Sequence, residues 1–274
     1  MTADRPASAA GWYPDPWRQA PVRWWDGRQW TPYLGGPPPP PRSSPPPATF
    51  AAAALPIAVG GIVVTVVVAR VLSSVAFPAL GAPDWLKLTV FYIEVFGGLY
   101  ATCRLASRRH GTGSVRRDYG VRWRPMDLVW CVAAFFAARW LQVLVLLGFS
   151  GQLDKLSRLV EGAEHVSTAA FVVFAVSAVI GAPIFEELCF RGLLQRSLTA
   201  RTSRWVAIAV QGLAFGAYHT VPELGWTNVP YVLSLSCFGF AAGFLADRTR
   251  RLGGGMSTHF VNNMLSVIVI AVRR

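Results

Sequence analysis

Cysteine is scarce in this sequence of 274 residues. The four cysteines stand singly in apolar segments, with no Cys-x-x-Cys pair and no Cys/His cluster. A structural zinc site is therefore not expected, and the thiols are interpreted as small buried hydrophobic groups. They are Cys103, Cys131, Cys189 and Cys237.

Acidic residues are also few, with 14 aspartates and glutamates against 26 lysines and arginines and a formal net charge of +12. The basic residues are almost all arginines in loops between apolar runs. The basic loops are 104–125, 196–204 and 247–252, and the arginine-poor loops are 149–167 and 220–228. This alternation predicts a multi-pass protein of the cell membrane, with the N-terminus and the basic loops in the cytoplasm. Only Arg273 and Arg274 disagree, and nucleic-acid binding is not expected.

Hydrophobic residues make up 53% of the chain, and its mean hydropathy of +0.39 is high for a soluble domain. A membrane span needs about 20 apolar residues. The candidate segments are 51–72, 86–103, 126–148, 168–187, 205–219, 229–246 and 255–272. The fifth is short, so we expect about seven spans in an all-α polytopic membrane helical bundle, within a range of about six to eight. Residues 3–10 contain no hydrophobic run, so no cleavable signal peptide is expected.

The composition divides the chain into three domains. Residues 1–34 are a short soluble tryptophan-rich module, 35–49 a proline-rich linker, and 50–274 the membrane domain. In the first, Asp26-Gly27 between aromatic residues predicts a two-residue type I′ hairpin turn. The module resembles the GWYPDP…RWWDGxxWT segment at the cytoplasmic ends of many actinobacterial membrane proteins. Its role stays open between a packing element and recognition of an unknown partner or of the membrane surface.

Two glutamates and an arginine lie together in the fourth apolar segment, in the sequence Glu186-Glu187-Leu188-Cys189-Phe190-Arg191. Ionisable groups at a bilayer centre cost roughly 2.5–3.5 kcal/mol each, so they indicate a site. Glu187 and Arg191 share a helix face and are expected to form a structural ion pair. Glu186 points about 100° away, which leaves it free to face a cavity. Pro183 is expected to loosen the helix, and a wholly structural set of charges remains the alternative.

Two histidines complete the pattern. His219 follows Phe215 by four residues, and it lies as far after the Arg201–Arg204 turn as Glu186 lies before it. In an antiparallel helical hairpin, Glu186 and His219 therefore come to similar depth. In the last segment, His259 and Asn263 are four residues apart, with Asn262 on a slightly different face. Side chains of this type can donate hydrogen bonds to an oxyanion.

The motifs EExxxR, FxxxH and HxxxN, in this order on successive apolar segments, resemble the CPBP family of intramembrane glutamic endopeptidases. The family includes CAAX prenyl proteases of the Rce1 type and bacteriocin-processing or immunity relatives. The resemblance covers residues 165–272. It implies that Glu186 and His219 activate a water, that His259 and Asn263 stabilise the oxyanion, and that Glu187 and Arg191 hold the helices in place.

A metal site competes with this interpretation. Glu186, His219 and His259 together form a known catalytic zinc ligand set. Asparagine is a poor zinc ligand, however, and the HExxH spacing of zinc proteases is absent from the sequence. We therefore expect a peptidase without a cofactor and keep zinc as the alternative.

Three functions fit a polar site inside a membrane domain. The leading hypothesis is an endopeptidase that cleaves a membrane-associated peptide or protein within the lipid bilayer. A catalytically silent scaffold or bacteriocin-immunity protein, and a transporter or channel, are the alternatives. Because His259 follows the basic Arg251 by eight residues, we expect the catalytic cavity to open to the cytoplasmic side, toward the basic loops, and laterally to lipid. We also expect Glu94 and Arg139, at similar depth in their spans, to form a structural ion pair.

Overall fold

A computed structural model of the chain describes residues 9–35, 52–152 and 165–274. The chain divides into two compact units, residues 1–44 and 45–274, and each is described by itself. Apart from Gly35, the predicted linker lies outside the described residues.

The N-terminal unit contains a three-stranded antiparallel sheet in the order β1-β2-β3. Its strands are β1 (Gly11–Pro14), β2 (Val22–Trp25) and β3 (Trp30–Leu34). Tryptophans pack edge to face across the strands, with ring centroids 5.4 Å apart for Trp12 and Trp24 and 5.3 Å apart for Trp25 and Trp30. A buried ion pair of 2.9 Å between Arg23 and Asp15 joins β2 to the segment after β1.

The hairpin predicted at Asp26-Gly27 is present, but its turn is longer than predicted. Trp25 pairs with Trp30, so four residues form the loop instead of two. The Asp26 carboxylate accepts hydrogen bonds from the backbone N–H groups of Arg28 and Gln29, both at 2.7 Å. Gly27 has a φ of +93°, which glycine adopts without a steric penalty. The aspartate side chain therefore closes a wider loop than the dipeptide alone predicts.

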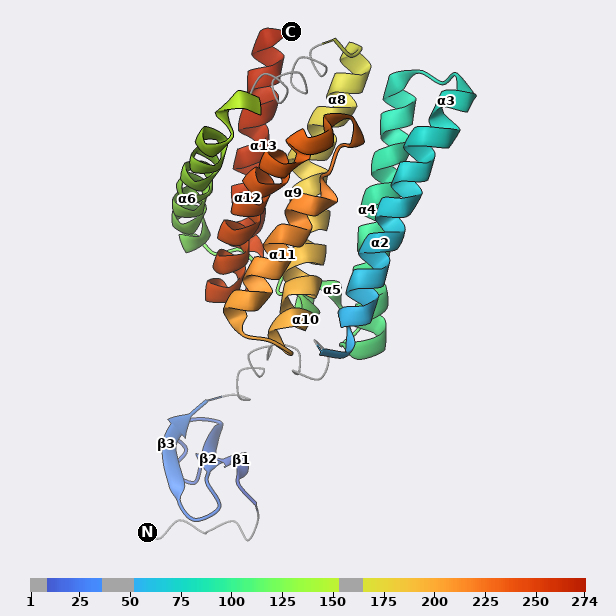
Figure 1. Ribbon diagram of the computed structural model, residues 1–274. Coiled ribbons are helices and arrows are strands. Elements are labelled where there is room, and N and C mark those ends of the chain that lie inside the picture. Colours follow the sequence, from blue (N-terminus) through green and yellow to red (C-terminus); the bar gives the residue numbers. More distant parts are fainter. Residues whose placement is uncertain (1–8, 36–51, 153–164) are drawn as a thin grey trace. The chain divides into compact units, whose positions relative to one another are not determined.

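The membrane unit is a helical bundle (Figure 1). Its first half contains α2 (Leu55–Val71), η1 (Leu72–Ala76), α3 (Phe77–Leu80), α4 (Asp84–His110), α5 (Val115–Asp118), α6 (Met126–Gly148) and η2 (Ser150–Gln152). Its second half contains α8 (Thr168–Val176), η3 (Ser177–Gly181), α9 (Ala182–Glu186), η4 (Glu187–Leu194), α10 (Gln195–Thr199), α11 (Arg204–Tyr218), η5 (Pro222–Thr227), α12 (Asn228–Thr249) and α13 (Gly253–Arg273). The polytopic helical membrane fold is thus confirmed.

Within the described residues, six helical segments are long and apolar enough to cross a membrane. They are Leu55–Ala79, Asp84–His110, Met126–Gly148, Thr168–Thr199, Pro222–Thr249 and Gly253–Arg273. The remaining predicted span corresponds to α11, which has 15 residues. A helix of that length extends roughly 22 Å, short of the roughly 30 Å hydrocarbon core.

The bundle has two distinct ends (Figure 1). We call the basic end the one where α2 begins, α4 ends, α10 turns into α11, and α12 turns into α13. Arginines there bind neighbouring loops: Arg196 donates to the backbone carbonyl of Asp118 at 2.9 Å, and Arg251 pairs with Asp127 at 2.6 Å. The opposite end contains the connections around η2 and η5 and the end of α13. The predicted basic loops therefore gather at one end.

The helical rod Thr168–Thr199 contains two π-helical segments, η3 and η4. Pro183 is the second residue after η3 and has no backbone N–H to donate, so the regular α-helical hydrogen-bond ladder is interrupted beside it. The second π segment begins at Glu187. Single π turns inside α-helices are rare and occur frequently at functional sites.

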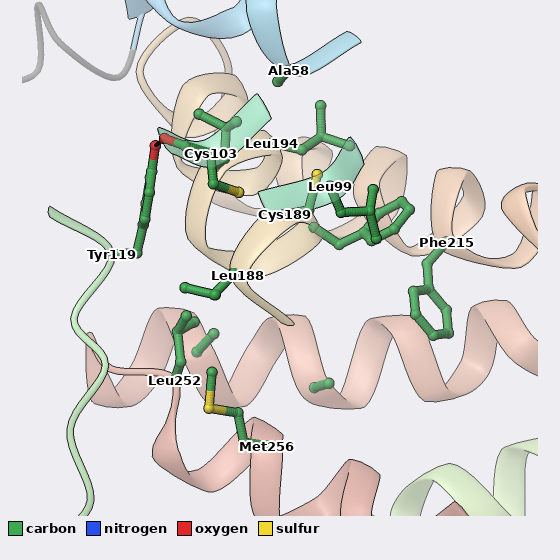
Figure 2. Close-up of a cluster of buried hydrophobic side chains, with 14 of the residues drawn as sticks. Ala58, Leu99, Cys103, Tyr119, Leu188, Cys189, Leu194, Phe215, Leu252 and Met256 are labelled. Carbon is green, nitrogen blue, oxygen red and sulfur yellow. Dashed lines mark hydrogen bonds between the residues drawn. The ribbon is translucent and has the colours of Figure 1, made fainter. Parts of the chain in front are cut away.

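A hydrophobic core holds this rod against its neighbours (Figure 2). Leu188 and Cys189 of η4 pack with Leu99 and Cys103 of α4 and with Phe215 of α11. All four cysteines are free and buried, as predicted. Close helix contact adds to the packing: a Cβ on Gly239 of α12 would lie 2.7 Å from Gly212 of α11. The site residues are thus positioned by tightly packed helices.

Candidate active site

Glu186, His219 and His259 meet in the middle of the bundle. Glu186 is the last residue of α9, His219 caps the C-terminus of α11, and His259 lies in the second turn of α13. The Nε2 atoms of both histidines lie 3.8 Å from Glu186 Oε2. Glu186 and His219 are therefore at the same depth, as the residue count on either side of the turn predicts.

The backbone and a second carboxylate orient the two imidazoles. His219 Nδ1 lies 2.8 Å from the carbonyl oxygen of Phe215, and His259 Nδ1 lies 3.2 Å from Glu187 Oε1. In each ring the Nδ1 atom has a fixed partner, so Nε2 is directed at Glu186. Glu186 Oε2 is buried and has no hydrogen-bond partner within the described part of the chain.

Glu187 faces away from the cavity and binds Arg191. Its Oε1 atom lies 2.9 Å from an Arg191 guanidinium nitrogen, and neither side chain is exposed. The guanidinium also stacks over the Phe215 ring, 4.3 Å from its centroid. A Cβ on Gly255 would approach Glu187 Oε2 to 2.7 Å, so α13 comes this close to the carboxylate because residue 255 has no side chain.

Aromatic rings enclose the histidines. The Phe215 ring lies 4.7 Å from the His219 ring and 5.8 Å from the His259 ring, centroid to centroid. Phe238 of α12 lies 4.8 Å from the His259 ring. Phe215 and Phe238 form an apolar wall of the cavity beside the histidines, and apolar surroundings strengthen electrostatic interactions.

Asn263 lies one turn beyond His259 and lines the same cavity. Its amide donates one hydrogen bond to the carbonyl oxygen of Ala178, at 2.8 Å, which connects α13 to η3. The neighbouring Asn262 amide donates to Asn263 Oδ1 at 3.1 Å. An asparagine amide has two N–H groups, so Asn263 retains one donor for a ligand.

A cavity of about 590 Å³ contains Glu186, His219, His259 and Asn263 in its wall. Its lining residues lie between 65 and 73 on α2 and η1, between 91 and 96 on α4, between 231 and 238 on α12, and between 259 and 267 on α13. On α2 with η1, on α4 and on α12 these stretches lie mainly in the half nearer the opposite end, whereas on α13 the stretch spans the middle of the helix. The lining on three of these four helices does not support the expectation that the cavity opens toward the basic loops. On α13 the lining begins at His259, near the basic end, and continues to Val267, farther from it.

The structure brings further polar residues to the cavity that the sequence motifs did not identify. They are Arg70 and Ser73 near the end of the first span, Tyr92 on α4, and Tyr231 on α12. Arg70 had a clear signal, because it is a charged residue inside the apolar run of Leu55–Ala79. The tyrosines had none, since tyrosine is common in membrane helices.

The predicted pair of Glu94 and Arg139 does not form. Arg139 of α6 lies against Phe135 and 3.4 Å from Gln142, while α4 packs on α2, α8 and the rod that contains Glu186. The two residues are at similar depth, but their helices lie on different sides of the bundle (Figure 1). Depth along a span contains no information about which helices are neighbours.

A metal ion would need three ligands at one point. Among the residues that the structure describes, no group of three or more His, Cys, Asp or Glu side chains is arranged to hold one. The residues considered as zinc ligands are Glu186, His219 and His259. The Nε2 atom of each histidine lies 3.8 Å from Glu186 Oε2. An imidazole with Nδ1 on a carboxylate and Nε2 facing the site is also the usual arrangement of a metal-ligating histidine. The donor types therefore fit zinc.

Comparisons with known proteins agree with the motifs. Residues 168–265 match the family described as type II CAAX prenyl endopeptidase Rce1-like. Residues 10–43 match a family of unknown function, DUF2510. The chain is 25% identical over 151 residues to a Bacillus subtilis (strain 168) protein named "Putative membrane peptidase YdiL". That match covers 53% of this chain and 57% of the relative. No solved structure is significantly similar.

Proposed function

We propose that this protein is an intramembrane endopeptidase, because residues 168–265 match the Rce1-like family. It hydrolyses a peptide bond of a membrane-associated peptide or protein, with a water activated by Glu186 and His219. The observation that carries the proposal is the buried Glu186 Oε2 atom, which faces the cavity without a hydrogen-bond partner in the described residues. A distance of 3.8 Å to either imidazole is longer than a hydrogen bond, so this oxygen is available to a water.

The proposed reaction is general acid–base hydrolysis. Glu186 accepts a proton from the water, whose oxygen attacks the carbonyl carbon of the scissile bond. The same carboxyl group then gives the proton to the leaving amine as the carbon–nitrogen bond breaks. His219 positions the water through Nε2 because its Nδ1 is held by the carbonyl of Phe215.

The negative charge on the carbonyl oxygen is stabilised by His259 and Asn263. Asn263 supplies its second amide N–H, and His259 supplies Nε2–H. With Nδ1 directed at Glu187, His259 donates from Nε2 only when the ring carries both protons. Glu187 and Arg191 hold this ring in position, which is a structural role.

The test is peptide cleavage by the purified full chain in lipid nanodiscs. A library of internally quenched peptides is incubated with the wild type and with Glu186→Gln. Gln has the shape of Glu but cannot take the proton, so cleavage should fall by a factor of about 10² to 10⁴. Equal cleavage by both variants would contradict the assignment. Absence of cleavage by the wild type would favour a silent scaffold or immunity protein.

A further inference from the structure

Arg70 is a charged residue well inside a membrane span. It lies nine residues before the end of the segment Leu55–Ala79, which is roughly 13 Å at 1.5 Å per residue. Arginine at such depth is rare, and it usually has an anionic partner or contacts a ligand pathway. The identity of its partner is therefore informative.

Within the described residues, Arg70 forms no salt bridge. Its side chain is exposed, and it lines the cavity that contains Glu186. One guanidinium N–H group donates to the backbone carbonyl of Thr220. A guanidinium has five N–H donors in a planar fork, so most of them remain available.

This hydrogen bond places Arg70 beside the reaction centre. Thr220 follows His219 directly, and successive Cα atoms are roughly 3.8 Å apart. His219 Nε2 in turn lies 3.8 Å from Glu186 Oε2. A group bound to Arg70 would therefore share the cavity with a peptide bond held at Glu186, within a few residues of it.

The charges around the cavity are simple. Among its lining residues, Arg70 is the one Lys or Arg, and Glu186 is the one Asp or Glu. Arg191 does not line the cavity, because it is fully buried against Glu187. Besides the two histidines, an incoming anion would therefore meet one permanently charged cation, and a planar guanidinium matches a carboxylate with two parallel hydrogen bonds.

We propose that Arg70 binds a carboxylate of the peptide substrate beside the scissile bond and so determines which peptides are cleaved. This inference rests on the proposed endopeptidase function. The carboxylate is either the free C-terminus of the peptide or an Asp or Glu side chain within a few residues of the cleaved bond. Both present the same planar anion to the guanidinium.

The experiment uses matched peptides with the full chain in nanodiscs. Each cleaved peptide is made in two C-terminal forms, the free acid and the amide. In a second set, each Asp is replaced by Asn and each Glu by Gln, one position at a time. The variants are wild type, Arg70→Gln, Arg70→Lys and Arg139→Gln. Arg139 is a matched control, since it is an intramembrane arginine on α6 that does not line the cavity.

The wild type should prefer one carboxylate form over its amide by about 10- to 100-fold in kcat/KM, mainly through KM. Arg70→Gln should abolish that preference, because kcat/KM for the carboxylate peptides falls to the level of their amides. Arg70→Lys should restore part of it, because the charge is kept while the fork is lost. Arg139→Gln should behave like wild type. If amidation of the C-terminus lowers kcat/KM, the bound carboxylate is the free C-terminus. If replacement of an Asp or Glu by its amide lowers it, the bound carboxylate is that side chain.

If Arg70→Gln lowered kcat/KM equally for the carboxylate and the amide peptides, the inference would be overturned, and the endopeptidase function would still hold. Such a result would indicate a structural role or an arginine that binds lipid phosphate. Binding gives an independent reading if no peptide is cleaved. The same peptides are then bound to Glu186→Gln with and without Arg70→Gln. Equal affinity for the carboxylate and amide forms, or no binding, would also overturn the inference.

Discussion

Glu186 and Glu187 are adjacent in the sequence, yet they have different surroundings. Glu186 lines the cavity, whereas Glu187 is enclosed by Arg191, His259 and the backbone of Gly255. On a helix, neighbours point about 100° apart, so the separation follows from the backbone alone. Glu186 is therefore placed to contact a substrate, whereas Glu187 is placed to stabilise the protein through Arg191 and His259.

This difference predicts opposite effects of two matched substitutions. Glu187→Gln should lower stability by roughly 3–5 kcal/mol, because it leaves Arg191 buried without a counter-ion. Glu186→Gln should leave the melting temperature nearly unchanged and remove cleavage. Thermal unfolding of both variants in the same nanodiscs, followed beside peptide cleavage, measures the two effects. A stable, active Glu187→Gln protein would show that the pair contributes little.

Chelators test whether the site formed by Glu186, His219 and His259 needs a metal ion. If these residues activate water without a metal, EDTA or phenanthroline should leave the initial rate unchanged, and elemental analysis should find far less than one zinc per chain. The zinc alternative uses the same three side chains as ligands. Loss of activity on chelation that added zinc restores would therefore support that alternative.

At the scale of elements, Gly255 allows α13 to approach the rod that contains Glu187. A Cβ at this position would lie 2.7 Å from Glu187 Oε2, and the carboxylate is already held by Arg191 and His259. Gly255→Ala should therefore displace α13, with a loss of about 1–3 kcal/mol from overpacking. Cleavage should fall as well, since His259 and Asn263 lie on the same helix.

Gly97 of α4 provides the control for that substitution. A Cβ there would meet no atom within 4 Å, so Gly97→Ala should be neutral or slightly stabilising. Melting temperatures and peptide cleavage are compared for the two alanine variants. If the two variants had the same melting temperature and the same cleavage rate, the close approach of α13 would not be needed for stability or activity.

The sequence predicts much of the helical arrangement, because membrane spans and charged motifs are local signals. The run of apolar residues predicts the spans, and equal spacing about Arg201–Arg204 predicts that Glu186 and His219 meet. Helix neighbours are not local signals. The predicted pair of Glu94 and Arg139 fails for this reason. The π turn at Glu187 and the four-residue loop after Trp25 depend on packing and on side-chain hydrogen bonds, which residue spacing alone does not specify.

At the scale of the whole molecule, the cavity and the basic loops lie toward different ends of the bundle. The positive-inside rule predicts that the basic end is cytoplasmic. The cavity would then be reached from the outer half of the membrane, and the substrate would be a peptide segment on that side or within the outer leaflet. This follows from two separate observations, the loop charges and the cavity lining, so a labelling experiment can test it.

Single cysteines at Ser114 and Glu223, in a background without the four native cysteines, report on the two ends. Ser114 precedes α5 at the basic end, and Glu223 is an exposed residue of η5 beside the cavity. In intact cells, a membrane-impermeant maleimide should label Glu223→Cys, and Ser114→Cys should be protected until the cells are lysed. The reverse pattern would place the cavity on the cytoplasmic side and would contradict the positive-inside assignment. In that case, cytosolic peptides would be the accessible substrates, and the N-terminal module would lie outside the cell.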